Sequence, residues 1–180
     1  MRKLGLIIIA LFVVLNISSQ DNISKLDFKV GTGIGFMGRG DSEVISFENE
    51  LNYKINNYIS TSLSMGIGRS IDNKINHNDY IQGSLNIFIS PFRNDKKNNF
   101  KIGAGYTLVN ETRAYSSNGK NELDSPYSYN SRTLNAFTII IENEYLINQK
   151  FLIGARLFST ASISQGGIVG GVMIKLGILI

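Results

Sequence analysis

The stretch FTIIIENEYLINQKFLIGARL, residues 137–157, carries the signal that decides the fold of this chain. Apolar residues recur at every second position from Phe137 to Ile141, and the alternation resumes from Phe151 onwards. A short polar turn lies between the two halves and is bracketed by Tyr145 and Phe151. Apolar residues at every second position predict strands that are apolar on one face. Aromatic residues at strand ends, beside tight turns, mark the water–lipid boundary of a transmembrane β-barrel.

Two other polar turns have the same aromatic brackets. Tyr53 and Tyr58 enclose four residues, and Phe92 and Phe100 enclose seven. Each turn separates two runs that alternate between apolar and polar residues, and this alternation continues along the chain. The pattern predicts an all-β fold, an eight-stranded antiparallel up-and-down transmembrane β-barrel that follows an N-terminal signal peptide.

The expected strands have roughly the ten residues that a tilted membrane-spanning strand needs, and their number is even, as in bacterial barrels. They cover residues 26–37, 45–53, 59–68, 81–90, 100–108, 137–145, 151–160 and 171–180. The three aromatic-bracketed turns join strands at one end of the barrel. The longer connections, near residues 39–43, 71–78, 114–131 and 164–166, lie at the other end. Because outer-membrane barrels have short periplasmic turns and longer outer loops, these four connections are expected to face outside.

The first residues have the features of a secretory signal. Arg2 and Lys3 precede an apolar run from Leu4 to Leu15, which is too short to span a membrane as a helix. We expect cleavage after Ser19, which divides the chain into a signal peptide (1–19) and a barrel domain (20–180). An uncleaved helical anchor is the alternative. The sequence has no cysteine, so neither disulfides nor a cysteine-linked lipid anchor is expected.

The charge pattern does not favour nucleic-acid binding. The formal net charge is +4, and removal of Arg2 and Lys3 would leave 16 basic residues against 14 acidic ones. The charges are interspersed and form no basic stripe of the kind that nucleic acids need.

The polar face of the strands is expected to line the lumen. A soluble barrel of the lipocalin type would have the opposite polarity, but an outer surface with so many glycines and so few charges would be poorly soluble. The acids and bases on this face should pair, because an unpaired buried charge costs several kcal/mol. We therefore predict a structural ion-pair network that closes the lumen to anything larger than water, and we expect Lys29 to face the acids of this network. Its members are Glu48, Glu50, Lys101, Glu142, Glu144, Arg156 and Lys175.

Two segments of the expected outer loops are candidates for interaction with a partner. Arg39, Gly40 and Asp41 form an RGD tripeptide of the kind that integrins bind, although a tight polar turn explains the same residues. Tyr127 and Tyr129 lie in the longest expected loop, and tyrosine is a frequent interface residue. An extracellular partner would use these loops.

The other motifs do not predict chemistry. Residues 33–38 match the dinucleotide pattern G-x-G-x-x-G, but a strand and not a helix follows them. His77 is the single histidine, and no nucleophile is placed beside it by any motif. Paired glutamates such as Glu142 and Glu144 can hydrolyse glycosides, but a narrow filled barrel has no room for a sugar. We expect no catalytic residue, metal site or cofactor.

The run from Glu144 to Arg156, the Gly31-Thr32-Gly33-Ile34-Gly35 segment, the expected export signal and the eight alternating strands resemble the small outer-membrane β-barrel families of OmpA/OmpX type. The resemblance implies location in the bacterial outer membrane and contact with its lipid and lipopolysaccharide. It also implies that the barrel-insertion machinery is a partner during biogenesis. The expected function is a non-enzymatic envelope structural or surface-interaction role. A narrow channel for water, ions or small hydrophobic solutes is the first alternative, and a lipid-modifying enzyme at the rim is the second.

Overall fold

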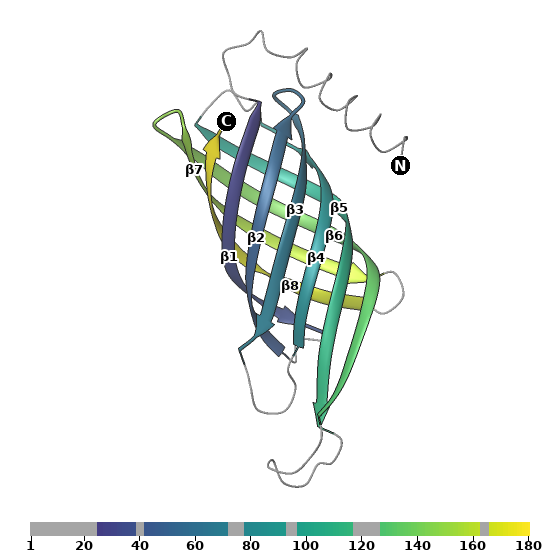
Figure 1. Ribbon diagram of the computed structural model, residues 1–180. Helices are drawn as coiled ribbons and strands as arrows, with labels where there is room; N and C mark the ends of the chain where they lie inside the picture. The colour runs from purple at the N-terminus through teal and green to yellow at the C-terminus, as the bar shows by residue number, and fades with distance from the viewer. Residues whose placement is uncertain (1–24, 39–41, 72–77, 93–96, 117–126, 163–165) are drawn as a thin grey trace, which may run out of the picture.

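A computed structural model describes residues 25–38, 42–71, 78–92, 97–116, 127–162 and 166–180. Eight antiparallel strands form a closed barrel in which each strand pairs with its neighbours in sequence (Figure 1). They are β1 (Leu26–Met37), β2 (Ser42–Lys54), β3 (Ile59–Ser70), β4 (Asn78–Ile89), β5 (Asn98–Ser116), β6 (Tyr127–Ile147), β7 (Phe151–Ser162) and β8 (Gly166–Leu179). The barrel closes where β1 pairs with β8, from Asp27 opposite Leu179 to Met37 opposite Val169. Among the described residues, no helix is long and apolar enough to cross a membrane.

The alternation in the sequence determines which side chains point outwards. Large apolar side chains on the outer face of every strand are exposed, such as Ile34, Met65 and Ile174, each more than 60% exposed. The residues between them are buried inside the barrel, and many are serine, asparagine or charged residues. An exposed apolar band around the whole wall is the surface that a barrel presents to lipid. The predicted fold and the assignment of the polar face to the lumen are both confirmed.

The three short turns lie at one end of the barrel, which we call the turn end. In the first turn, the Asn56 side chain accepts hydrogen bonds from the backbone N–H groups of Tyr58 and Ile59, both at 2.8 Å. In the β6–β7 turn, Asn148 and Gln149 have positive φ angles of 48° and 59°, as a tight type I′ hairpin requires. These local features explain why such short polar sequences reverse the chain.

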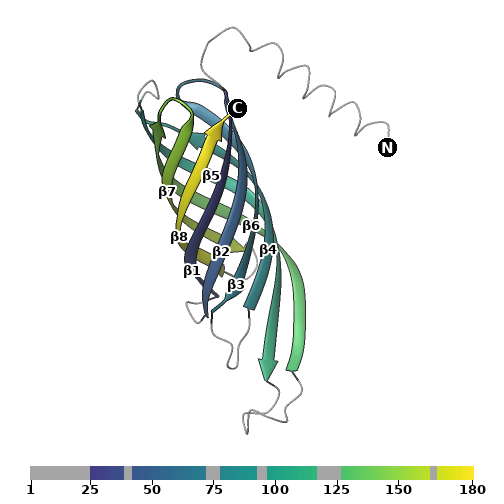
Figure 2. The ribbon, with the colours of Figure 1, turned by 60° about the vertical axis from the view of Figure 1, so that its left-hand side comes forward.

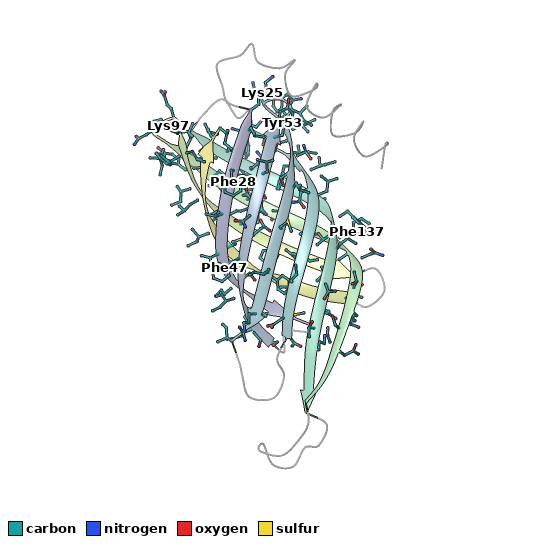
Figure 3. All side chains as sticks on the ribbon, viewed as in Figure 1. Lys25, Phe28, Phe47, Tyr53, Lys97 and Phe137 are labelled. Atoms are coloured by element: carbon teal, nitrogen blue, oxygen red, sulfur yellow. The ribbon has the colours of Figure 1, made fainter. Side chains whose placement is uncertain are left out.

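Aromatic side chains surround the turn end. Phe92 and Phe100 pack with their ring centroids 6.2 Å apart, and Tyr145 and Phe151 are exposed beside the β6–β7 turn. Figure 3 shows Lys25, Tyr53 and Lys97 at this end of the barrel, with Lys97 on the opposite side of the rim from the other two. The aromatic brackets in the sequence therefore occupy one rim of the apolar band, where interfacial aromatics are expected.

The opposite end, which we call the loop end, differs from the sequence prediction. The β5–β6 hairpin is longer than expected and extends beyond the rest of the barrel wall (Figures 1 and 2). The predicted connection at 114–131 is wrong in its bounds, because β5 continues to Ser116 and β6 begins at Tyr127. Tyr127 and Tyr129 therefore belong to a strand and not to a loop. The prediction failed because polar residues replace the apolar ones in this part of the hairpin, while the strands still pair.

Candidate functional site

Nine charged side chains meet inside the half of the barrel nearest the turn end. None of them is more than 8% exposed, and six strands (β1, β2, β5, β6, β7 and β8) contribute them. We call this group the charged network. Its members are Asp27, Lys29, Glu48, Glu50, Lys101, Glu142, Glu144, Arg156 and Lys175.

Arg156 lies at the centre of the network. Its guanidinium contacts Glu48 at 2.5 Å, and it also contacts Glu50 and Glu142. The β6–β7 register places Arg156 directly opposite Glu142, while Glu48 and Glu50 reach it from β2. The planar, five-donor guanidinium suits such a position because it can serve several carboxylates at once.

Three lysines complete the network around Arg156. The Lys175 ammonium lies 2.8 Å from Glu48 and 2.9 Å from Glu50. The Lys29 ammonium lies 2.9 Å from Glu50 and also contacts carboxylates on β1 and β6. Lys101 lies 2.7 Å from Glu144 and 3.1 Å from Glu142. Each carboxylate therefore has at least one cation, as buried charges require.

Asp27 is the member of the network that the sequence analysis did not assign. It lies on β1, 3.4 Å from the ammonium of Lys29, and it accepts a 2.8 Å hydrogen bond from the Asn52 amide. Its position two residues before Lys29, on the same face of the strand, is the signal that could have identified it.

Glycines make room for these long side chains. A Cβ atom added at Gly177 would lie 2.7 Å from Cγ of Lys29, and one at Gly31 would lie 2.6 Å from Sδ of Met173 and 3.1 Å from Cγ of Lys175. Real Cβ atoms do not approach so closely, so a larger residue at either position would displace its neighbours. The long side chains beside Gly31 and Gly177 can therefore keep their positions only while these two residues are glycine.

Phe88 packs against the network from β4, one residue before the end of that strand. Its ring is fully buried, with the Lys101 ammonium 5.1 Å and the Arg156 guanidinium carbon 5.7 Å from its centroid. A cation over an aromatic face is attracted by the ring quadrupole, so Phe88 contacts the charges favourably while presenting carbon to the rest of the lumen.

The other half of the lumen contains an apolar cluster among buried polar residues, which the sequence analysis did not predict. We call this cluster the apolar plug; its members are Met37, Val44, Tyr80, Val109, Leu134, Ala136, Ile140, Phe158, Val169 and Met173. The available signal was the interruption of strict alternation, as in Ile139-Ile140-Ile141 and Leu157-Phe158, where both faces of a strand are apolar.

A row of hydroxyl groups crosses four strands beside the plug. Ser84 contacts Thr107 at 2.9 Å, Thr107 contacts Thr138 at 2.6 Å, and Thr138 contacts Thr160 at 2.9 Å. Each hydroxyl can donate to one neighbour and accept from the next, so buried polar atoms satisfy one another without water.

A second, smaller charge cluster lies near the loop end. The Glu111 carboxylate is fully buried and contacts Arg132 directly across the β5–β6 hairpin. It also contacts Arg113 at 3.3 Å. The sequence analysis missed this cluster because it ended the fifth strand at residue 108.

The remaining sequence candidates cannot be placed in a site. Arg39, Gly40 and Asp41, and also His77, lie outside the described residues, as does the expected signal peptide. Gly33 and Gly35 lie within β1, which pairs with β2 and β8. The G-x-G-x-x-G match is therefore part of a barrel strand and not a nucleotide-binding turn.

Solved structures of small outer-membrane barrels are similar to this chain. Neisserial surface protein A matches with a TM-score of 0.60 and 9% identity, over 86% of this chain and 96% of that protein. Yersinia pestis Ail, in complex with the heparin analogue sucrose octasulfate, matches with a TM-score of 0.56 and 15% identity, over 85% and 95%. The N-terminal barrel domain of Pseudomonas aeruginosa OprF matches with a TM-score of 0.52 and 11% identity, over 84% and 96%. No protein-family model and no curated protein matches the chain.

At these low identities the likeness establishes the fold. The exposed apolar band is independent of the comparisons and requires a lipid environment. The chain therefore has the fold of the small eight-stranded β-barrels of bacterial outer membranes, with an apolar wall suited to lipid.

Proposed function

We propose that this chain is a non-enzymatic barrel with a closed lumen, which has a structural or surface-interaction role in the cell envelope. The observation that supports the proposal most is the filling of the lumen. The charged network, with Phe88 packed against it, fills the half nearest the turn end, and the apolar plug and the row of hydroxyls occupy the other half. An eight-stranded barrel is just wide enough for side chains to fill it, which supports a lumen without a solute path.

Each layer opposes permeation for a different reason. An ion would have to separate carboxylates and cations of the charged network that lie about 3 Å apart, leaving buried charges unpaired at a cost of several kcal/mol. It would then have to enter the apolar plug without its hydration shell. A small hydrophobic solute could enter the plug but would meet the charged network beyond it. The two layers together disfavour both classes of solute.

The contacts with partners are expected on the outside. The β5–β6 hairpin extends past the other strands at the loop end, which faces away from the cell if the short turns are periplasmic (Figure 2). A rigid, filled barrel would hold this hairpin at a fixed height above the membrane. We therefore place any surface interaction on the hairpin and the neighbouring loops, including the segment with Arg39, Gly40 and Asp41.

Planar-bilayer recording tests the closed lumen. The purified wild-type barrel should insert without a stable conductance. The triple variant Phe88→Ala/Arg156→Ala/Phe158→Ala removes the central cation and large rings from both layers, and it should produce discrete conducting events. Lys150→Ala, which changes an exposed residue of the β6–β7 turn, is the matched control and should stay silent. A large, stable conductance of the wild-type protein would refute the proposal in favour of a channel.

A further inference from the structure

Part of β6 has a strand on one side only. The β5–β6 pairing continues to Ser116 opposite Tyr127, whereas the β6–β7 pairing ends at Ala136 opposite Ser162. Among the strands that the structure describes, the backbone of residues 127–135 therefore pairs with β5 alone. We call these residues the β6 edge. Both views show this part of β6 beyond the ends of the other strands, with β5 on one side of it (Figures 1 and 2).

The open side of the hairpin is almost entirely on β6. β4 pairs with β5 as far as Asn78 opposite Arg113, so β5 lacks a described neighbour only from residue 114 to its end at Ser116. In an antiparallel ladder, alternate residues direct their backbone N–H and C=O groups to the same side. The β6 edge therefore offers about four such residues to an incoming strand, which matches a typical strand of about five or six residues.

The β6 edge has few of the features that prevent strand addition. Natural edge strands are usually very short, or they carry proline or several charges. The β6 edge, YSYNSRTLN, contains no proline and no glycine, and Arg132 is its only charged residue. Tyrosine and threonine, which occur in it, are favoured in strands. Its exposed side chains include Asn130, Ser131, Thr133 and Asn135.

Arg132 determines which strand fits the β6 edge. Its side chain is 31% exposed and contacts Glu111 directly across the hairpin, and Arg113 contacts the same carboxylate at 3.3 Å. Two guanidinium groups therefore share one carboxylate, and the cluster has an excess of positive charge. The residue of a new strand that lies directly opposite Arg132 would be on the same face, with its Cβ atom about 5 Å away. A basic residue there would be repelled, and an acidic one would be attracted.

Leu134 adds a second requirement. It lies two positions from Arg132, on the same face of β6, and belongs to the apolar plug. The residue two positions from the acid on an incoming strand would lie beside Leu134, where an apolar side chain would extend the plug. The other face of the β6 edge, with Ser131 and Thr133, is exposed and polar.

We propose that the β6 edge binds an extended, acidic segment of another protein, which adds to the hairpin as a further strand. The segment has an acid opposite Arg132 and an apolar residue opposite Leu134. Backbone hydrogen bonds supply the affinity, and these two side-chain pairs supply the selectivity. The inference rests on the surface-interaction role proposed above and names the class of partner. A second copy of this chain is a poorer match, because its own β6 edge contains no acidic residue and brings another Arg132.

Fluorescence anisotropy of labelled peptides, titrated with the full chain in detergent, tests the inference. The probe is a nine-residue peptide of alternating threonine and valine in which one valine is replaced by glutamate. The wild-type protein should bind it about fivefold more tightly than the matched peptide with glutamine at that position, because the glutamate pairs with Arg132. The peptide with lysine there should bind most weakly.

Methylation of peptide nitrogens separates strand addition from a simple charge contact. Only one of the two sets of alternate positions directs its N–H groups towards the β6 edge. Methylation of that set should weaken binding about tenfold, because it removes ladder hydrogen bonds, whereas methylation of the other set should have little effect.

Substitution of Arg132 tests the charge pair from the side of the barrel. Arg132→Gln should remove the preference for the glutamate peptide over the glutamine peptide, and Arg132→Lys should retain it. Arg69→Gln is the matched control, since Arg69 is an exposed cation at the loop end of β3, outside the hairpin. This variant should keep the wild-type preference. Folding of each variant is checked by heat-modifiable gel mobility.

Three results would overturn the proposal. Equal wild-type binding of the glutamate and glutamine peptides would remove the role of Arg132 in selecting the partner. Equal effects of the two methylation sets would show that the peptide does not add as a strand. Dimers of the wild-type chain that form without peptide, and that the peptide dissociates, would assign the β6 edge to a second copy. None of these results alters the conductance of the barrel, so they are distinguishable from a failure of the closed lumen.

Discussion

Replacement of Arg156 by methionine should destabilise the barrel strongly. The Arg156 guanidinium contacts Glu48, Glu50 and Glu142 together. Methionine fills much of the same volume but carries no charge. The substitution changes the network from five carboxylates and four cations to five carboxylates and three cations, all of them buried.

The magnitude follows from the partners that remain. In the variant, the Lys175 ammonium still lies within 4 Å of Glu48, Glu50 and Glu142, at 2.8, 2.9 and 3.8 Å respectively. The cost is therefore that of one broken buried ion pair and not of three, about 3–5 kcal/mol. With a urea dependence of about 2 kcal/mol per molar, the unfolding midpoint should fall by roughly 1.5–2.5 M.

Equilibrium urea unfolding in lipid vesicles, followed by the gel mobility of the folded barrel, measures this shift. Lys150→Met replaces an exposed cation in the β6–β7 turn and should leave the midpoint within about 0.5 kcal/mol of the wild type. The double variant Arg156→Met/Glu142→Gln should recover part of the loss, because it restores the balance of charge. An Arg156→Met midpoint equal to that of the wild type would refute the view that the network is coupled through this residue.

Three further predictions concern other layers of the barrel. Gly105→Val should cost about 1–3 kcal/mol in urea unfolding, since a Cβ atom there would lie 2.0 Å from the Asn86 side chain, whereas Gly83→Val should be nearly neutral; equal midpoints would contradict this. Thr138→Val removes the middle hydroxyl of the row and should lower the unfolding free energy by about 1–2 kcal/mol, and no change would mean that its neighbours find other partners. Glu111→Ala removes the carboxylate that pairs with two arginines of the β5–β6 hairpin, so limited trypsin digestion should cleave there several times faster than in the wild type, and unaltered digestion would show that this carboxylate does not order the hairpin.

The sequence predicted the barrel wall well because the wall follows a local rule. Each strand must present alternate residues to lipid, and that demand appears directly as apolar residues at every second position, as from Phe151 to Leu157. The charged residues of the candidate site could be expected to pair for a related reason. A charge on the lumen face cannot reach solvent, so Glu50, Glu142 and Arg156 have to find one another.

The sequence could not predict how the lumen is divided along its axis. Both lipid and the apolar plug accept aliphatic residues, so Ile140 between Ile139 and Ile141 gives no indication of which face it occupies. The length of the β5–β6 hairpin was missed because polar residues, and not apolar ones, occur on both faces. From Asn110 to Arg113 the residues of β5 are polar on both faces, and such a polar run resembles a loop.

The charged network also has a consequence for assembly. Its contacts join residues far apart in the chain, such as Lys175 and Glu48, which are separated by 127 positions. The network includes residues of both β1 and β8, the two strands that close the barrel, so it is incomplete until the last strand is in place. A half-inserted chain would carry unpaired charges into a hydrocarbon environment, at a cost of several kcal/mol each. Strand closure and membrane entry should therefore be a single concerted event, and open intermediates should be short-lived.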